Sequence, residues 1–226
     1  MTDYSIKSTI SQYRYDHFFH YLIINNDELR LFLCQYVSQD FTIKTTTVDN
    51  SEDFHHHYEG KRFILDVVCR DEKGRYYNIE MQNGYIDESE QLRFERYAQR
   101  LVARQEKQGH DLTDIKEVFQ LILYNGKPMD QFEHYVHQLK KSDKNYHIDY
   151  KGDKVKTTIL QLALLEEENN MERQLGTMEQ VGYLMHFNKA HENSLMDHLV
   201  EKIIDMHDEY MSIEEADYAY KLETER

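Results

Sequence analysis

The sequence predicts an α/β fold whose core follows the order helix, three strands, helix and strand, with a mainly helical, acidic extension at the C-terminus. Two runs of β-branched and aromatic residues flank the turn-forming residues 71–74 and predict a β-hairpin over 62–82. Apolar residues recur at helical spacing on both sides of this hairpin. From residue 163 onward, periodic Leu, Met and Ile stand among dense Glu, which predicts three or four further helices.

The segment before the hairpin supplies two helices and a strand. A first helix is expected from about residue 13 to residue 19. A second is expected over 26–37, because Asn26 can cap its N-terminus and Leu29, Leu33 and Val37 share one face. The four threonines of 41–48 are typical of a strand.

The segment after the hairpin is expected to supply the last elements of the core and then the first elements of the C-terminal extension. Its predicted elements are a helix over 87–108 ended by Gly109, a strand over 116–124, a helix over 131–141, and a hairpin of 146–150 with 154–160. We therefore expect two parts, a core of residues 1–125 and an extension of residues 126–226 that packs on it.

Two carboxylates face each other in the predicted hairpin. Because side chains alternate between the two faces of a strand, Asp66 and Glu80 are expected on the face opposite the apolar residues, almost directly across from each other. Like charges in that position are destabilising, and burial adds to the cost. A divalent cation would offset it, and oxygen ligands of this kind suit Mg²⁺. Gln82, on the same face, could orient a water beside such an ion but supplies no positive charge.

The same residues carry a resemblance to a known family. Asp66, thirteen further residues and then Glu80-Met81-Gln82 resemble the site of the PD-(D/E)XK nuclease superfamily. More narrowly, the chain is similar to the recombination-promoting nuclease and transposase-like family, in which a glutamine takes the place of the usual lysine. His20 departs from the lysine expected there. The flanking positions that match are Asp16, Phe19, Leu31, Phe32, Leu33, Arg93, Tyr97, Leu101, Gln105, Gly109, Leu112, Lys116 and Val118.

The resemblance implies a restriction-endonuclease-like core and a Mg²⁺-dependent DNA endonuclease with a recombination-promoting or transposase-like role. In that interpretation Asp66, Glu80 and the main-chain carbonyl of Met81 hold the metal, Gln82 helps to orient the attacking water, and Mn²⁺ is expected to substitute for Mg²⁺. The alternative is a catalytically weak or inactive nuclease-fold module that acts by binding DNA or protein.

The helix expected over 87–108 carries a basic stripe. Arg93, Arg96, Arg100, Arg104 and Lys107 fall within an arc of about 80°. The stripe could contact DNA phosphates, or it could be a solvated face or a docking surface for the acidic C-terminal region. Gln105 lies in the adjacent apolar face. It could position a water near the metal, or it could be a half-buried amide bonded to the main chain.

The net charge of −15 is the main objection to a nucleic-acid enzyme. Its distribution weakens that objection. Residues 166–226 hold 16 acidic and 5 basic residues, a net of −11, which leaves −4 for the first 165. The expected catalytic part is thus close to neutral.

The remaining sequence features concern the expected location of the protein and the state of its cysteines and histidines. No apolar run reaches membrane-spanning length and the N-terminus lacks a signal-peptide pattern, so we expect a cytoplasmic protein with no membrane partner. Self-association through the C-terminal region stays open. Cys34 and Cys69 are expected to be reduced core residues, and the adjacent histidines 55–57 to lie in a solvated loop, since adjacent side chains cannot all face one metal.

Overall fold

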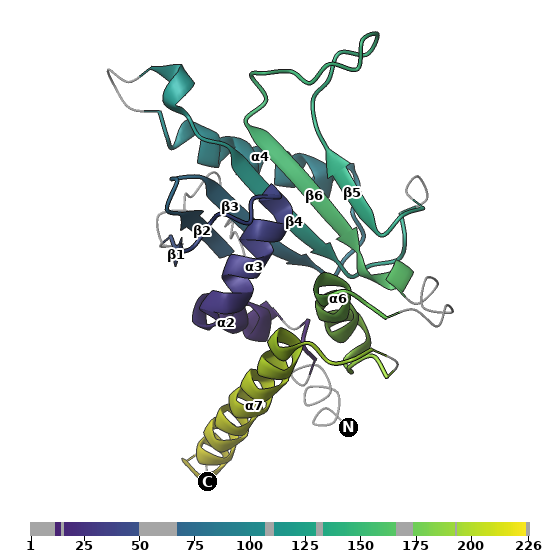
Figure 1. Cartoon of the computed structure of the whole chain (residues 1–226). Coiled ribbons are helices and arrows are strands. Elements are labelled where there is room, and N and C mark those ends of the chain that lie inside the picture. The colour runs from purple at the N-terminus through teal and green to yellow at the C-terminus, as the bar shows by residue number, and fades with distance from the viewer. Residues whose placement is uncertain are drawn as a thin grey trace. The chain divides into compact units, whose positions relative to one another are not determined.

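A computed structural model shows the arrangement of the chain (Figure 1). Some residues with a predicted role lie outside the part of the chain that the structure describes. These are Asp66, Lys107, Gly109 and the histidines 55–57. The described residues are 12–14, 16–49, 67–106, 111–129, 133–165, 174–192 and 194–224, with side chains of the last helix described as far as residue 213.

The chain divides into two compact units. One unit is Asn26–Leu164, and the other joins the N-terminal Met1–Asn25 to Leu165–Arg226. The predicted division into 1–125 and 126–226 does not coincide with this one, because strands from residues beyond 125 complete the sheet of the first unit.

The unit Asn26–Leu164 is built on one six-stranded sheet of order β1-β2-β3-β4-β6-β5. The three central strands β3, β4 and β6 are parallel to one another, and the outer pairs are antiparallel. Parallel strands are buried on both faces, and every residue of β4 is buried accordingly. The strands are β1 Thr46–Val48, β2 Val67–Asp71, β3 Tyr76–Gln82, β4 Val118–Tyr124, β5 Val136–Leu139 and β6 Val155–Gln161.

Two helices cover the two faces of this sheet (Figure 1). Helix α3, Asp27–Ser38, begins at the predicted cap, where the Asn26 side chain accepts a hydrogen bond from Leu29 N. Helix α4, Glu88–Ala103, packs Tyr97, Ala98 and Leu101 against one face of the sheet. The strand residues of this cluster, one each from β2, β3, β4 and β6, are Val68, Tyr76, Val118 and Val155. Cys69, one position from Val68 and so on the other face, meets Cys34 of α3 with 3.5 Å between the sulfurs. Both cysteines are buried and free, as predicted.

The predicted hairpin is present as β2 and β3, and its register agrees with the prediction. The residue numbers of each described pair add up to 146, as in Val67↔Ile79 and Cys69↔Tyr77. The sequence predicts sums near 145, one less than observed, which places Asp66 and Glu80 almost opposite each other. Of that pair, Glu80 lies in the described part of the chain.

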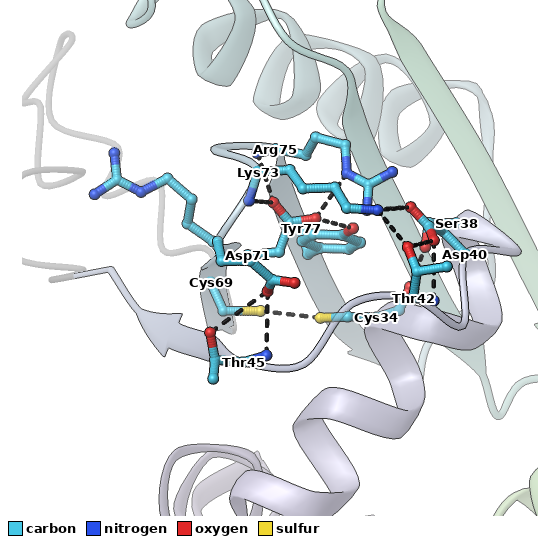
Figure 2. Close-up of polar contacts among 12 residues, drawn as sticks. Cys34, Ser38, Asp40, Thr42, Thr45, Cys69, Asp71, Lys73, Arg75 and Tyr77 are labelled. Atoms are coloured by element: carbon cyan, nitrogen blue, oxygen red, sulfur yellow. Dashed lines mark hydrogen bonds and ion pairs between the residues drawn. The ribbon is translucent and has the colours of Figure 1, made fainter.

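Asp71 fixes the turn of this hairpin (Figure 2). Its buried carboxylate accepts hydrogen bonds from Lys73 N, Arg75 N, Arg75 Nε and the Tyr77 hydroxyl, at 2.7 to 2.9 Å. Burial, then the hydrogen bond to Asp71, raises the pKa of Tyr77. Removal of one partner from a buried ion pair costs about 3–5 kcal/mol. The turn is therefore a rigid base for β3.

Asp40 joins the loop after α3 to the same turn. It forms ion pairs with Lys73 at 2.6 Å and with Arg75 at 2.9 Å. The loop is also held by Glu72, which accepts hydrogen bonds from Lys44 N and Thr45 N. These contacts connect the first covering helix to the hairpin.

Two predictions for residues 131–160 are wrong. The expected helix over 131–141 contains strand β5, and β6 pairs with β5 in place of residues 146–150. Pairing with the exposed edge of β6 outweighs a local helical pattern in so short a segment. Residues 140–154 instead form a ribbon that carries an isolated bridge, Ser142↔Asp149.

The second unit contains helices α2 (Asp16–Asn25), α6 (Thr177–Phe187) and α7 (His198–Thr224). The break predicted near Gly176 is confirmed, because α6 begins directly after it. Aromatic rings connect α2 to α7, with Tyr13 stacked on His207 at 4.1 Å between centroids and Phe18 edge-on to it at 4.8 Å. Among the described helices, none is both long and apolar enough to cross a membrane.

We predict that Asp40 stabilises the fold in a pH-dependent way. Hydrogen bonds from Lys73 first, and then from Thr42 and Arg75, lower the pKa of the Asp40 carboxyl. A lowered folded-state pKa gives stability that is present above the unfolded value, about 4, and is lost as the pH falls through the folded value. Asp40→Asn should therefore lower Tm at about pH 7 and have a smaller effect at about pH 3.

The control is Asp149→Asn, which removes an exposed ion pair with Lys140. Exposed pairs contribute about 0–1 kcal/mol, so this variant should keep the wild-type Tm at both pH values. An Asp40→Asn deficit of equal size at both pH values would contradict the assignment.

Candidate active site

The candidate site lies on the face of β3 that α4 covers. Asn78, Glu80 and Gln82 alternate along this strand and so point to one side of the sheet. Tyr76, which shares that side, belongs to the cluster formed with Tyr97 and Leu101 of α4. Asn78 and Glu80 are thus buried between a central strand and a helix, and Gln82 is half-buried at the end of the strand.

Glu80 is a buried acid with a polar neighbour. Its residue is 4% exposed, and Asn78 is fully buried. The Asn78 Nδ2 donates a hydrogen bond of 2.6 Å to Glu80 Oε1. The Asn78 Oδ1 is also buried and has no hydrogen-bond partner within the described part of the chain. Carboxylate and amide oxygens are therefore concentrated in one enclosed place.

Gln82 is in contact with a cation from α4. The Arg93 Nη2 donates to Gln82 Oε1 at 2.9 Å and forms an ion pair with Glu90 Oε2 at 2.7 Å. The Arg93 guanidinium also lies 5.7 Å from the Tyr97 ring centroid. A positive charge is thus held beside Gln82, the residue that the resemblance places at the usual lysine position.

Tyr97 connects the acid and the cation. Burial raises the pKa of Tyr97, and the charge of Arg93 opposes this shift while that of Glu80 adds to it. The phenol therefore stays neutral at physiological pH. The pKa of this one buried phenol therefore responds to both charges, that of Glu80 and that of Arg93.

Three other residues predicted for the site are held elsewhere. Arg104 forms an ion pair of 3.4 Å with Asp49, and Arg96 is exposed. Gln105 accepts from Lys116 N at 2.8 Å and donates to Lys116 O at 3.1 Å, beyond the end of α4. Of its two predicted roles, these contacts match the amide bonded to the main chain. The structure does not bring Gln105 to Glu80.

The chemistry of the donor set fits a hard divalent cation. Glu80 supplies carboxylate oxygens and Asn78 an amide oxygen that has no other described partner. Hard cations such as Mg²⁺ are held by one or two carboxylates together with other oxygen ligands. Within the described ranges no group of three or more His, Cys, Asp and Glu side chains could hold a metal. Asp66, the second predicted carboxylate, lies outside those ranges.

A comparison with protein families identifies the chain. The family described as PD-(D/E)XK nuclease family transposase matches residues 14–225. The chain belongs to this family. No curated protein and no solved structure matches it. The six-stranded sheet and the five described α-helices are consistent with a PD-(D/E)XK-like fold.

Membership of the family indicates a nuclease or transposase-like function with DNA as the substrate. Nucleases of this class generally use divalent metal ions. The buried acid on β3 and its amide neighbour are the described groups of this family member that suit such an ion.

Sequence reasoning missed two residues of this site. Asn78 is not among the residues that the sequence predicts for the site. The signal was present, because 78, 80 and 82 are successive polar positions on one face of an otherwise apolar strand. Tyr97 stands four residues after Arg93, one helical turn along α4, so it had to share that face with the cation.

Proposed function

We propose that this protein is a Mg²⁺-dependent DNA endonuclease that hydrolyses phosphodiester bonds in a recombination-promoting or transposase-like process. The observation that carries the proposal is the burial of Glu80 beside Asn78, under α4, in a member of a nuclease family. Burial of a carboxylate is costly, and coordination of a divalent cation would offset that cost.

The metal ligands in this proposal are Asp66, Glu80 and the main-chain carbonyl of Met81, and we propose Asn78 Oδ1, which is buried beside Glu80, as a fourth oxygen ligand. A bound Mg²⁺, or Mn²⁺ in its place, would activate a water and stabilise the charge that develops on the phosphate. Asn78 holds the Glu80 side chain in place by donating a hydrogen bond to Glu80 Oε1.

Gln82 and Arg93 divide the task of the missing lysine. Gln82 orients the water with its amide, which can both donate and accept hydrogen bonds. Arg93 supplies the positive charge that the amide lacks, since its guanidinium already touches Gln82 Oε1. A guanidinium near the cleaved phosphate stabilises the negative charge of the transition state.

The other cations of α4 act on the substrate. Arg96, Arg100 and Arg104 are proposed to contact DNA phosphates along the outer flank of the helix, and Arg104 would exchange its ion pair with Asp49 for one with a phosphate. Gln105 keeps the end of α4 on the chain before β4. We expect the enzyme to act in the cytoplasm.

The proposal predicts metal-dependent cleavage that needs both acids. Supercoiled plasmid should be nicked by the wild type with Mg²⁺ or Mn²⁺ and left intact when EDTA is present. Asp66→Ala and Glu80→Gln should each lower the rate at least about 100-fold, because loss of a ligand should exceed the cost of losing an outer partner. Glu80→Gln keeps an oxygen for the Asn78 hydrogen bond, so its Tm should stay near that of the wild type.

Glu106→Ala, an exposed acid just after α4, is the matched control and should cut at the wild-type rate. Equal cutting by all variants would identify a contaminating nuclease and remove the support for catalysis. If the wild type is inert with every metal but still binds DNA, the protein is a binding module on a nuclease scaffold.

The division of roles between Gln82 and Arg93 predicts a rescue. Arg93→Gln should lower kcat about 100-fold, as loss of a charged donor at a transition state does. Adding Gln82→Lys to that variant should restore much of the loss, because it returns a cation to the same place. Arg96→Gln, on the exposed flank, should weaken DNA binding and leave kcat unchanged. A double variant as slow as Arg93→Gln alone, with wild-type Tm, would refute a role for the charge.

A further inference from the structure

The ribbon of residues 140–154, between β5 and β6, differs in charge from the rest of the chain. It holds five lysines and three aspartates, a net of +2, in a protein whose net charge is −15. Figure 1 shows the ribbon extending past the ends of both strands. Every residue from 140 to 152 is exposed. We refer to residues 140–154 as the basic arm.

The aspartates of the basic arm are used by the arm itself. Asp143 accepts hydrogen bonds from Asn145 N and Tyr146 N, and Asp149 pairs with Lys140 at 2.8 Å. Asp153 is buried and accepts from Lys141 N at 2.9 Å. In the described part of the chain, Lys144 and Lys151 have no such acidic partner. The positive charge that remains therefore faces solvent.

Large apolar side chains accompany these lysines. Tyr146, Ile148 and Tyr150 are 76%, 64% and 65% exposed. Ile148 and Tyr150 flank the bridged Asp149, so they lie on one face of the ribbon. The Tyr150 ring lies over Gly152, where an added Cβ would come within 2.7 Å of Cε1. Exposed aromatic groups interleaved with lysines mark an interaction surface.

The basic arm is folded before any partner arrives. Asp143 N donates to Ile148 O and Tyr150 N to Lys141 O, both at 2.9 Å. Lys141 Nζ also lies 3.4 Å from Glu95 Oε1 on the flank of α4 away from the arginines. A preformed ribbon pays less ordering entropy on binding, and the major groove of duplex DNA admits a two-stranded β-ribbon.

We propose that the basic arm is a second DNA contact, in which Lys144 and Lys151 bind phosphates and the tyrosines contact the groove. The proposal rests on the proposed function, since it assumes that the substrate is duplex DNA. The arm ends where β6 begins, at the end of the sheet opposite Gln82, because Val155 pairs with Val118 and Tyr124 with Gln161. It would therefore hold DNA away from the cleaved bond and set how much flanking duplex the enzyme needs.

The test measures binding of a labelled DNA duplex by fluorescence anisotropy over a salt series, in a Glu80→Gln background that should not cut. Lys144→Gln with Lys151→Gln should weaken binding about tenfold and reduce the slope of log K against log[salt] by about 2. Tyr146→Ala with Tyr150→Ala should weaken binding without changing the slope. The control is the double variant Lys44→Gln with Lys189→Gln, which removes two lysine charges outside the basic arm.

Equal loss of affinity in the arm and control variants, or loss in neither, would overturn the arm contact. So would an effect on self-association without an effect on DNA affinity, because the partner would then be the acidic region of a second copy. The nuclease proposal is judged separately, by cleavage in the Glu80-intact protein. If the wild type cleaves DNA but the arm variants bind DNA as tightly as the wild type, only the arm contact is refuted. If the arm variants lower DNA affinity and the salt slope but the wild type does not cleave DNA with any metal, only the nuclease proposal is refuted.

Discussion

Glu80 is buried on a central strand, and this burial constrains the groups that surround it. A parallel strand at the centre of a sheet has no solvent face, so each polar side chain on it must be matched by another group. Asn78 meets one oxygen of Glu80, and Arg93 from α4 meets Gln82. The helix that closes the face thus also brings the cation. Covering the sheet and assembling the candidate site are the same packing event.

The position of β3 is set at its far end. Asp71 gathers four donors from the turn and from Tyr77, while Asp40 ties the loop after α3 to the same place. These contacts saturate the acidic groups with donors of the chain itself, which is why this cluster is structural. At the other end of the strand, the amide oxygen Oδ1 of Asn78 lies buried beside Glu80 and has no hydrogen-bond partner among the described residues. The acidic cluster around Asp71 and Asp40 therefore stabilises the turn, whereas Asn78 and Glu80 belong to the candidate site.

The sequence could predict the elements whose local pattern agrees with their packing. The α3 cap at Asn26, the β2–β3 register and the strand before Tyr124 follow from capping, pairing and apolar composition. It could not predict β5, because the pairing of Val136–Leu139 depends on the free edge of β6 and not on local composition. Nor could it predict that Arg93 reaches Gln82, since their contact requires the helix to lie on the strand. Gln105 shows the converse, because its position in an apolar face fitted two roles and only the tertiary contacts with Lys116 separate them.

The most direct measurement is the anomalous scattering of Mn²⁺ in crystals of the wild-type protein. If a divalent ion binds the acid buried on β3, we expect a peak about 2 Å from a carboxylate oxygen of Glu80, with the Asn78 hydrogen bond to Glu80 retained. Manganese found only elsewhere, or a Glu80 carboxylate with no ion beside it at saturating metal, would contradict the proposed metal site.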